Sequence, residues 1–232
     1  MGLTPTGPIA VHTFILTPTT SEARPIARRL RLKPSGQRSW AGGGMTLHVV
    51  GIGSGAVDRI PDLPELSAGL PRVLVVGLGG ALDPVLQAGD VCRPVRVVNE
   101  TGGSIPLDGT GLDEIELLST SKIIVDADQK TMLRRQVGAA VIDMETYAIA
   151  ERLSGRVNLG ALRVISDDAQ TTLPPGIDDW LHPEGVIAPW GLARSLLRRP
   201  DRWFSTARFM RQAAKATARL AQAVANEVEA NA

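Results

Sequence analysis

Acidic residues follow two apolar runs of the chain, at positions where a buried strand would end. The run AAVID at 139–143 changes into a helical pattern, with Asp143 and Glu145 at the junction. The run LGALRVIS at 159–166 is followed by Asp167. Carboxylates at strand ends can act as general acids or bases, or accept hydrogen bonds from substrate hydroxyl groups. The alternative needs no function: Asp143 caps the helix, and Glu145 favours its positive end.

A third acidic candidate, Glu22, follows the first apolar run, IAVHTFIL at 9–16. It is interpreted either as a general base or as a first-turn helix residue after Thr20 and Ser21, where acids are common. Asp167 likewise has an ordinary alternative, as a turn acid beside Asp168. The cysteine and the histidines show no metal-ligand spacing, and core or surface roles are expected for Cys92, His12, His48 and His182.

The elements that must position these acids are short apolar runs bounded by glycine or turn residues. Strands are predicted at 9–16, 45–52, 72–78, 90–98, 121–127, 139–143 and 159–166. Several runs are apolar on both faces, which is typical of strands covered by helices on each side. Helices are predicted at 21–32, at 144–155 and, after residue 184, as two segments separated by Arg199-Pro200. The expected fold is one α/β domain, residues 1–232, with a central mixed β-sheet flanked by helices.

Composition agrees with one domain of 232 residues whose core is built from aliphatic side chains, because 44% of residues are hydrophobic and only 3% aromatic. A single cysteine excludes an internal disulfide framework, and no run of about 18 apolar residues offers a membrane span. The N-terminal residues show no secretory pattern, so a cytoplasmic location is expected.

Charge is unevenly distributed along the chain. Residues 190–232 carry eight basic and three acidic side chains, a net charge of +5, whereas residues 1–189 carry −4. The last predicted helix, about 202–228, has an apolar face with Trp203, Ala207, Met210, Ala214, Ala221, Val224 and Val228, and a basic stripe with Arg208, Arg211, Lys215 and Arg219. The stripe is interpreted as a solvated face or as a peripheral membrane contact. No nucleic-acid-binding module accompanies it, so no nucleic acid partner is expected.

The motif GIGSGA at 51–56 fits the dinucleotide fingerprint G-x-G-x-x-A, which suggests a Rossmann oxidoreductase. That fingerprint requires an acidic residue about 20 positions later, and the run RVLVVGLGG supplies none. The glycines are therefore expected to allow a tight turn and a close approach of the backbone to a ligand or another chain.

Three blocks carry a resemblance to a known family: VVGLGGALDPVLQAGDVC at 75–92, DMETYA at 143–148 and RVISDDA at 163–169. In this order they resemble the nucleoside phosphorylase superfamily, which includes purine nucleoside phosphorylases and methylthioadenosine/S-adenosylhomocysteine nucleosidases. The resemblance implies the corresponding α/β fold and cleavage of an N-glycosidic bond. It also implies a nucleoside as the small-molecule substrate, no cofactor or metal, and a homo-oligomer.

The resemblance also implies roles for individual residues. Asp167 would protonate or hydrogen-bond N7 of the purine, and Glu22 would activate water. Arg163 and Ser166 would belong to the substrate-binding residues by positioning Asp167 or the loop at the base; the alternative for Arg163 is an ion pair with a surface acid. Glu145 would accept both ribose hydroxyls, because one carboxylate presents two acceptor oxygens to a vicinal diol. Substrate-lining positions would be Met144, Gly79 and Gly80, while Asp143 is expected mainly to cap the helix.

Departures from the family pattern favour water over phosphate as the nucleophile. The phosphate loop of the phosphorylases is replaced by TPTTSEAR at 17–24, and their Arg and Ser/Thr donors by Val75-Val76-Gly77-Leu78. Phosphorolysis stays open, because Arg24, Arg59 or a basic residue of another subunit could restore an anion site. The rival hypothesis is a non-catalytic nucleoside-binding or structural protein with the same fold.

A closer similarity suggests the nature of the substrate. Glu22-Ala23-Arg24, Asp143-Met144-Glu145, LPPG at 173–176 and SLLRRP at 195–200 resemble the hopanoid-associated branch of the superfamily. This resemblance implies a 5′-substituted adenosine such as adenosylhopane, handled by a protein with basic C-terminal helices at about 184–232.

Overall fold

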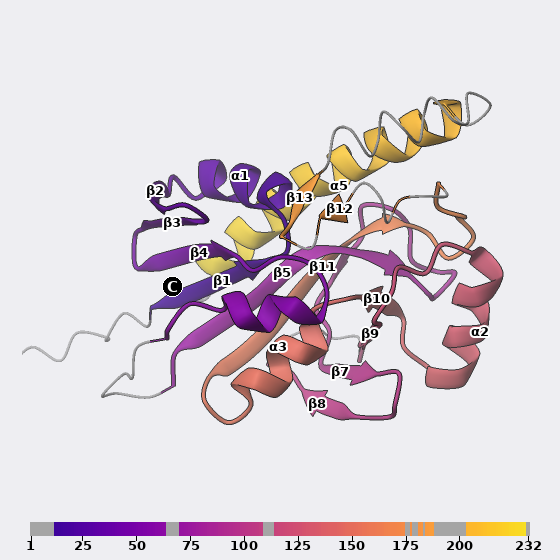
Figure 1. Ribbon diagram of the computed structural model, residues 1–232, viewed down its shortest axis with the longest axis horizontal. Helices are drawn as coiled ribbons and strands as arrows, with labels where there is room; N and C mark the ends of the chain where they lie inside the picture. The colour runs from indigo at the N-terminus through magenta and orange to yellow at the C-terminus, as the bar shows by residue number, and fades with distance from the viewer. Residues whose placement is uncertain are drawn as a thin grey trace, which may run out of the picture.

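The computed structural model describes residues 12–63, 70–108, 114–174, 177, 181–182, 184–187 and 203–230. Within this part of the chain, eleven strands form one mixed sheet with helices on both faces (Figure 1). This arrangement confirms the predicted fold class. The elements up to the centre of the sheet are β1 (Thr13–Thr17), α1 (Thr20–Arg29), β2 (Lys33–Gly36), β3 (Ser39–Gly42), β4 (Met45–Val49), the 3₁₀ helix η1 (Ser54–Arg59) and β5 (Arg72–Ala81).

The second half of the chain adds β6 (Val91–Cys92), β7 (Arg96–Asn99), β8 (Ser104–Pro106), β9 (Glu116–Ser119), α2 (Ala127–Val137), β10 (Val141–Asp143), α3 (Thr146–Leu153) and β11 (Asn158–Asp167). The small pair β12 (Leu181–His182) and β13 (Val186–Ile187) lies outside the main sheet, and α5 (Trp203–Glu229) follows.

β5 is the centre of the sheet and explains where an open site can form. Along one edge it pairs in parallel with β11 from Arg72 to Gly80. On the other edge it pairs with β1 only as far as Val75, and then with β10, antiparallel, at Gly80 and Ala81. The strand therefore changes partner between these two pairings. Ligand sites in open α/β sheets form where neighbouring strands diverge in this way.

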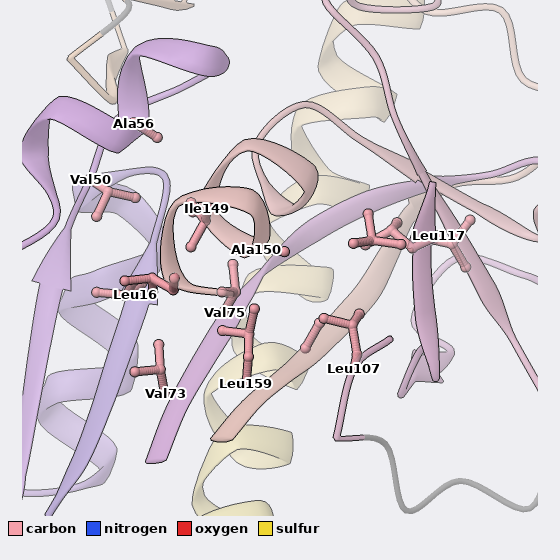
Figure 2. Packing of buried hydrophobic residues seen from close by; sticks show 14 of the residues in the cluster. Leu16, Val50, Ala56, Val73, Val75, Leu107, Leu117, Ile149, Ala150 and Leu159 are labelled. Atoms are coloured by element: carbon pink, nitrogen blue, oxygen red, sulfur yellow. The ribbon is translucent and has the colours of Figure 1, made fainter. Parts of the chain in front are cut away.

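The side chains of β5 alternate between two hydrophobic cores, which is why the run is apolar on both faces. Val73 and Val75 pack with Leu16, Val50 and Ile149 in the cluster shown in Figure 2. On the opposite face, Leu74 and Val76 belong to a second cluster that includes side chains of α1 and α5. Both faces of the sheet are thus covered, as the sequence predicted.

α5 packs against α1, β11 and β5 (Figure 1). Its most deeply buried apolar side chains are Ala216, Leu220 and Val224. The predicted apolar face is correct at Ala221 and Val224 but wrong at Ala207 and Ala214, which are exposed. The stripe of small residues is broad, so helical spacing alone did not fix which part of it faces the sheet.

The predicted strand at 121–127 is wrong. Residues 121–126 lead without a strand into α2, whose N-cap Asp126 accepts hydrogen bonds from the N–H groups of Asp128 and Gln129. Ile124 packs against a small hydrophobic cluster around Leu82 and Leu118 and does not take part in strand pairing. A short apolar run therefore does not by itself specify a strand. The predicted strand at 90–98 is interrupted and forms β6 and β7.

Other elements were not predicted, namely η1, α2, β2, β3, β8, β9, β12 and β13. The helix predicted just after residue 184 and its boundary at Arg199-Pro200 fall largely outside the described residues, which show β13 at Val186–Ile187. None of the helices in the described ranges is long and apolar enough to cross a membrane.

Candidate active site

A cavity of about 700 Å³ lies where β5 changes partner from β1 to β10. One part of its wall is polar and contains Glu22, Lys130, Asp143, Glu145, Ser166 and Asp167. Another part is apolar and includes Ile123, Leu173, Ile177, Phe209 and Met210. Acidic side chains that are far apart in the sequence therefore meet at one cavity with a mainly apolar extension.

Glu22 lies in the first turn of α1, as one of its two interpretations predicted, and its side chain also lines the cavity. Its Oε2 accepts hydrogen bonds from the N–H (3.0 Å) and Oγ1 (2.5 Å) of Thr19, which forms a capping box at the start of α1. Its Oε1 accepts the N–H of Leu78 at 2.8 Å, at the point where β5 lacks a neighbouring strand on that edge. Burial raises the pKa of Glu22, and the hydrogen bonds from Thr19 and Leu78 oppose this shift.

Gly77 makes room for the Glu22 carboxylate. A Cβ atom at this glycine would lie 3.1 Å from Pro18 and 3.3 Å from Glu22 Oε1. Gly79 and Gly80, but not Gly77, were predicted as substrate-lining positions. These two also line the cavity, and a Cβ at Gly80 would approach Asp167 Oδ2 to 3.2 Å. The glycines of β5 thus let both carboxylates approach the strand.

Glu145 lies at the N-terminus of α3 and is 5% exposed. Its Oε1 accepts a hydrogen bond from the N–H of Gly53 at 2.9 Å. Gly53 has a φ of 74°, so the GIGSGA turn uses a glycine conformation to aim this N–H at the site. Burial and the nearby Asp143 carboxylate raise the pKa of Glu145 to about 8, while Gly53 and Arg163 oppose the shift. Met144 also lines the cavity.

Asp143 supports the start of α3, although Glu145 is the N-cap residue: its Oδ2 accepts the N–H of Thr146, the first helical residue, at 3.2 Å. The same oxygen accepts from Arg163 Nη2 at 2.5 Å and from Nε at 3.1 Å. The side chains of this pair are 1% and 0% exposed. Asp143 therefore combines a hydrogen bond to the start of α3 with a buried ion pair, which was not predicted.

The hydrogen bonds of Arg163 go to groups other than Asp167, so Arg163 does not position that carboxylate directly. Besides Asp143, its guanidinium donates to Thr146 Oγ1 at 2.6 Å and to the backbone oxygen of Val75 at 3.1 Å. It is fully buried and is not among the side chains that line the cavity. Through Asp143 and Thr146 it holds the start of α3, and hence Glu145, from the side that faces away from the cavity.

Asp167 ends β11 after an irregularity in the pairing between Ile165 and Asp167, which brings it opposite Gly80. Its Oδ1 accepts the hydroxyl of Ser166 at 2.5 Å, as the predicted positioning role of Ser166 requires. Its Oδ2 accepts a hydrogen bond from Lys130 Nζ, also at 2.5 Å. Asp167 and Ser166 both line the cavity.

Sequence reasoning missed Lys130 completely. It lies on α2, a helix that was not predicted, and it stands among other charged residues that give it no distinctive spacing. A stronger signal for the helix was available, because Asp126 is a favourable N-cap and Gly138, with a φ of 82°, a favourable helix end.

The arginines proposed to restore an anion site lie elsewhere. Arg24 is exposed on α1 and does not line the cavity. Arg59 Nη1 donates to the backbone oxygens of Gly55 at 2.8 Å and Val50 at 3.3 Å. Among the described residues, the cationic side chains that line the cavity are Arg28, Lys122 and Lys130.

The described residues contain no group of three or more His, Cys, Asp or Glu side chains that could hold a metal ion. The Rossmann alternative is also weakened, because GIGSGA leads into the 3₁₀ helix η1 and its Gly53 N–H faces Glu145. A dinucleotide site requires an α-helix N-terminus at this point to bind the pyrophosphate.

Solved structures of nucleosidases share this fold over nearly the whole chain. One is 5′-methylthioadenosine/S-adenosylhomocysteine nucleosidase (MTAN) of Helicobacter pylori, an Asp-to-Asn variant with 5′-methylthioadenosine in its active site. It aligns with a TM-score of 0.65 and 16% identity, covering 95% of this chain and 99% of that chain.

Two further structures agree. MTAN of Chlamydia trachomatis, also an Asp-to-Asn variant and bound to MTA, has a TM-score of 0.61 and 15% identity, covering 94% of this chain and 97% of that chain. Futalosine hydrolase of Helicobacter pylori strain 26695 has a TM-score of 0.60 and 17% identity, covering 93% and 97%. No protein-family model and no curated protein sequence matches the chain. The likeness confirms the fold of the resemblance found in the sequence.

Proposed function

We propose that the protein hydrolyses the N-glycosidic bond of a purine nucleoside of the adenosine type that carries a 5′ substituent. The observation that carries the proposal is the meeting of Glu22, Glu145 and Asp167 at one cavity. They come from α1, the start of α3 and the end of β11, and each is held by hydrogen bonds from its surroundings.

The reaction assigns one task to each acid. Glu22 takes a proton from water, whose oxygen bonds to C1′ as the bond from C1′ to N9 breaks. The electron pair of that bond remains on the purine, and Asp167 donates a proton to N7. Glu145 accepts hydrogen bonds from the two ribose hydroxyls. Division of labour between carboxylates is the usual solution for glycosidic bonds, because the leaving group needs an acid and the nucleophile a base.

The structural neighbours support a nucleoside as the substrate, since two of them contain 5′-methylthioadenosine and a third is a futalosine hydrolase. Water is favoured over phosphate because Arg24 lies outside the cavity and Arg59 is engaged by backbone oxygens. Arg28 and Lys122 keep phosphorolysis testable as the second route.

An apolar 5′ substituent is supported by the wall of the cavity away from the acids. Phe209, Met210 and Ala213 of α5 face this space, together with Leu173 and Ile177. Apolar walls bind an apolar chain by removing it from water, at about 25 cal/mol per Å² buried. We therefore extend the proposal to an adenosyl lipid such as adenosylhopane.

The direct test is incubation with adenosine, 5′-methylthioadenosine, S-adenosylhomocysteine and an adenosyl lipid, each with and without phosphate. We expect adenine release from at least one 5′-substituted nucleoside without phosphate. Release that requires phosphate and yields the ribose 1-phosphate would overturn the hydrolytic route alone. Tight binding without any release would support the rival, a non-catalytic nucleoside-binding protein.

Nucleoside binding should depend on the protonation of Glu145. Its pKa is raised to about 8, so the carboxyl group is protonated in the empty site at neutral pH. Two ribose hydroxyls favour the carboxylate, which has more acceptor capacity. Affinity for 5′-methylthioadenosine should therefore rise from pH 6 to 8 by up to about tenfold per unit and level off above it.

Isothermal titration calorimetry in buffers of different ionisation enthalpy measures this effect as proton release on binding. Glu145→Gln should bind more weakly and lose the dependence. Both measurements use the Asp167→Asn background, which should bind the nucleoside without cleaving it. An affinity that is constant over this range in Asp167→Asn alone would contradict a ribose-binding role for Glu145.

The basic stripe of α5 supports a peripheral membrane contact, because Arg208, Arg211, Lys215 and Arg219 are all exposed. Replacing all four by Gln should abolish sedimentation with anionic vesicles, since each basic residue near such a surface contributes about 1 kcal/mol. A matched control replaces four exposed basic residues elsewhere: Lys33, Arg135, Arg152 and Arg156. Equal recovery of the unmodified protein in the supernatant with and without vesicles would count against the contact.

A further inference from the structure

Lys130 is a lysine with no exposure to solvent, on a helix that otherwise contributes little to the site. Its side chain is 1% exposed, and that of its partner Asp167 is 6% exposed. Nζ donates three hydrogen bonds, to Asp167 Oδ2 at 2.5 Å and to the backbone oxygens of Asp168 and Thr171, each at 3.0 Å. These bonds use all three protons of the ammonium group.

Stability alone is a weak explanation for this pair. Removing two charges from water is unfavourable, and replacing a buried ion pair with apolar side chains is often neutral or stabilising. The pair also lies at the cavity wall, since both side chains line it. Its location suggests that it serves the chemistry of the site.

The contacts of Asp167 show how Lys130 would act. Ser166 Oγ contacts Oδ1 at 2.5 Å, and Lys130 contacts Oδ2, so the carboxyl group is held from both sides. Lys130 also ties down the backbone of Asp168 and Thr171, the segment that follows directly. The rotation of Asp167 about its side-chain bonds is thereby restricted.

We propose that Lys130 is a positioning residue for leaving-group protonation, an inference that rests on the proposed function. Its ammonium group fixes the orientation of Asp167 towards the purine and sets the electrostatic field in which Asp167 exchanges its proton. The consequence is selective: Lys130 matters when the leaving base needs a proton, and matters little when it does not.

The test compares two substrates that differ in this requirement. Adenine leaves 5′-methylthioadenosine with a proton, whereas 4-nitrophenolate leaves a 4-nitrophenyl riboside as a stable anion. For Lys130→Met, which keeps the length of the side chain, we expect adenine release to fall by about 10²-fold, within the usual range for acid catalysis. Cleavage of the nitrophenyl riboside should change by less than about threefold, because no acid acts in that step.

The ratio of the two rates is the decisive quantity, because partial unfolding lowers both rates equally. Lys130→Gln provides a second variant, with a neutral donor, if Lys130→Met does not fold. Combining Lys130→Met with Asp167→Asn should add almost nothing to the loss caused by Asp167→Asn alone, since both changes act through one group. Lys33→Met, at an exposed lysine of β2, is the matched control and should leave the ratio unchanged.

Equal losses on both substrates would overturn the positioning role and leave Lys130 as a structural residue. Additive losses in the double variant would overturn it as well, because Lys130 would then act independently of Asp167. If the unmodified protein cleaved the nitrophenyl riboside but released no adenine, the positioning role would fall while glycosidic cleavage stood. If it cleaved neither substrate, both the proposed function and this inference would be rejected.

Discussion

Asp167→Asn should slow adenine release by about 10² to 10⁴-fold, the range expected when a general acid is lost. Asparagine has nearly the same shape, and its amide oxygen can still accept a hydrogen bond from Lys130 Nζ, which contacts Oδ2 in the structure. It cannot carry the proton that the purine needs. We therefore expect binding of 5′-methylthioadenosine to persist while turnover is lost.

The measurement is single-turnover adenine release, together with a dissociation constant for the nucleoside. The neighbouring Asp168 is the appropriate control, because its Oδ1 holds a local turn through the N–H of Gln170 and the hydroxyl of Thr171. Asp168→Asn should cause a much smaller loss. Full activity in Asp167→Asn would reject Asp167 as the acid.

Glu22→Gln should cause a second large loss of hydrolysis, also about 10² to 10⁴-fold, because an amide cannot take a proton from water. Glutamine is accepted at this position of a capping box, so α1 should remain folded. The variant also removes the unfavourable free energy of burying a charged carboxylate, which the raised pKa of Glu22 reflects. We expect the melting temperature to change little.

The raised pKa of Glu22 adds a pH signature. The base works only when ionised, so hydrolysis should fall as the pH drops through this pKa, at a higher pH than for an ordinary glutamate. Rate measurements across the acidic range test this expectation. Glu151→Gln, at an exposed position of α3, is the matched control. Unchanged kcat in Glu22→Gln would show that another group activates water.

The sequence determined the general fold and pointed to three acids that the structure brings to one cavity. Runs such as RVLVVGL are apolar on both faces, and such strands are stable only between two layers of helices. Glu22 and Asp167 follow β1 and β11, which both run parallel to β5. Glu145 follows β10, which pairs antiparallel with the end of β5 and so runs back towards the same cavity. The motifs that contain them, Glu22-Ala23-Arg24, DMETYA and RVISDDA, are local features that can be recognised in the sequence.

Local patterns failed where long-range pairing decides. The run at 121–127 was predicted as a strand, but it leads into α2 without strand pairing. Its apolar side chain Ile124 is instead packed against a small hydrophobic cluster. Asp143 and Glu145, two residues apart, also have different partners that the sequence did not reveal. Asp143 pairs with Arg163, twenty residues away, while Glu145 is bonded by Gly53, ninety-two residues away.

Only the tertiary structure placed Lys130 against Asp167, thirty-seven residues apart in the chain, and α5 along the apolar wall of the cavity. A lysine on a charged helix carries no sequence signal that separates a buried ion pair from a solvated side chain. The small residues of α5 are compatible with several helix orientations. Burial and partner choice depend on contacts between distant segments, so the groups beyond the three acids became visible only when the chain was folded.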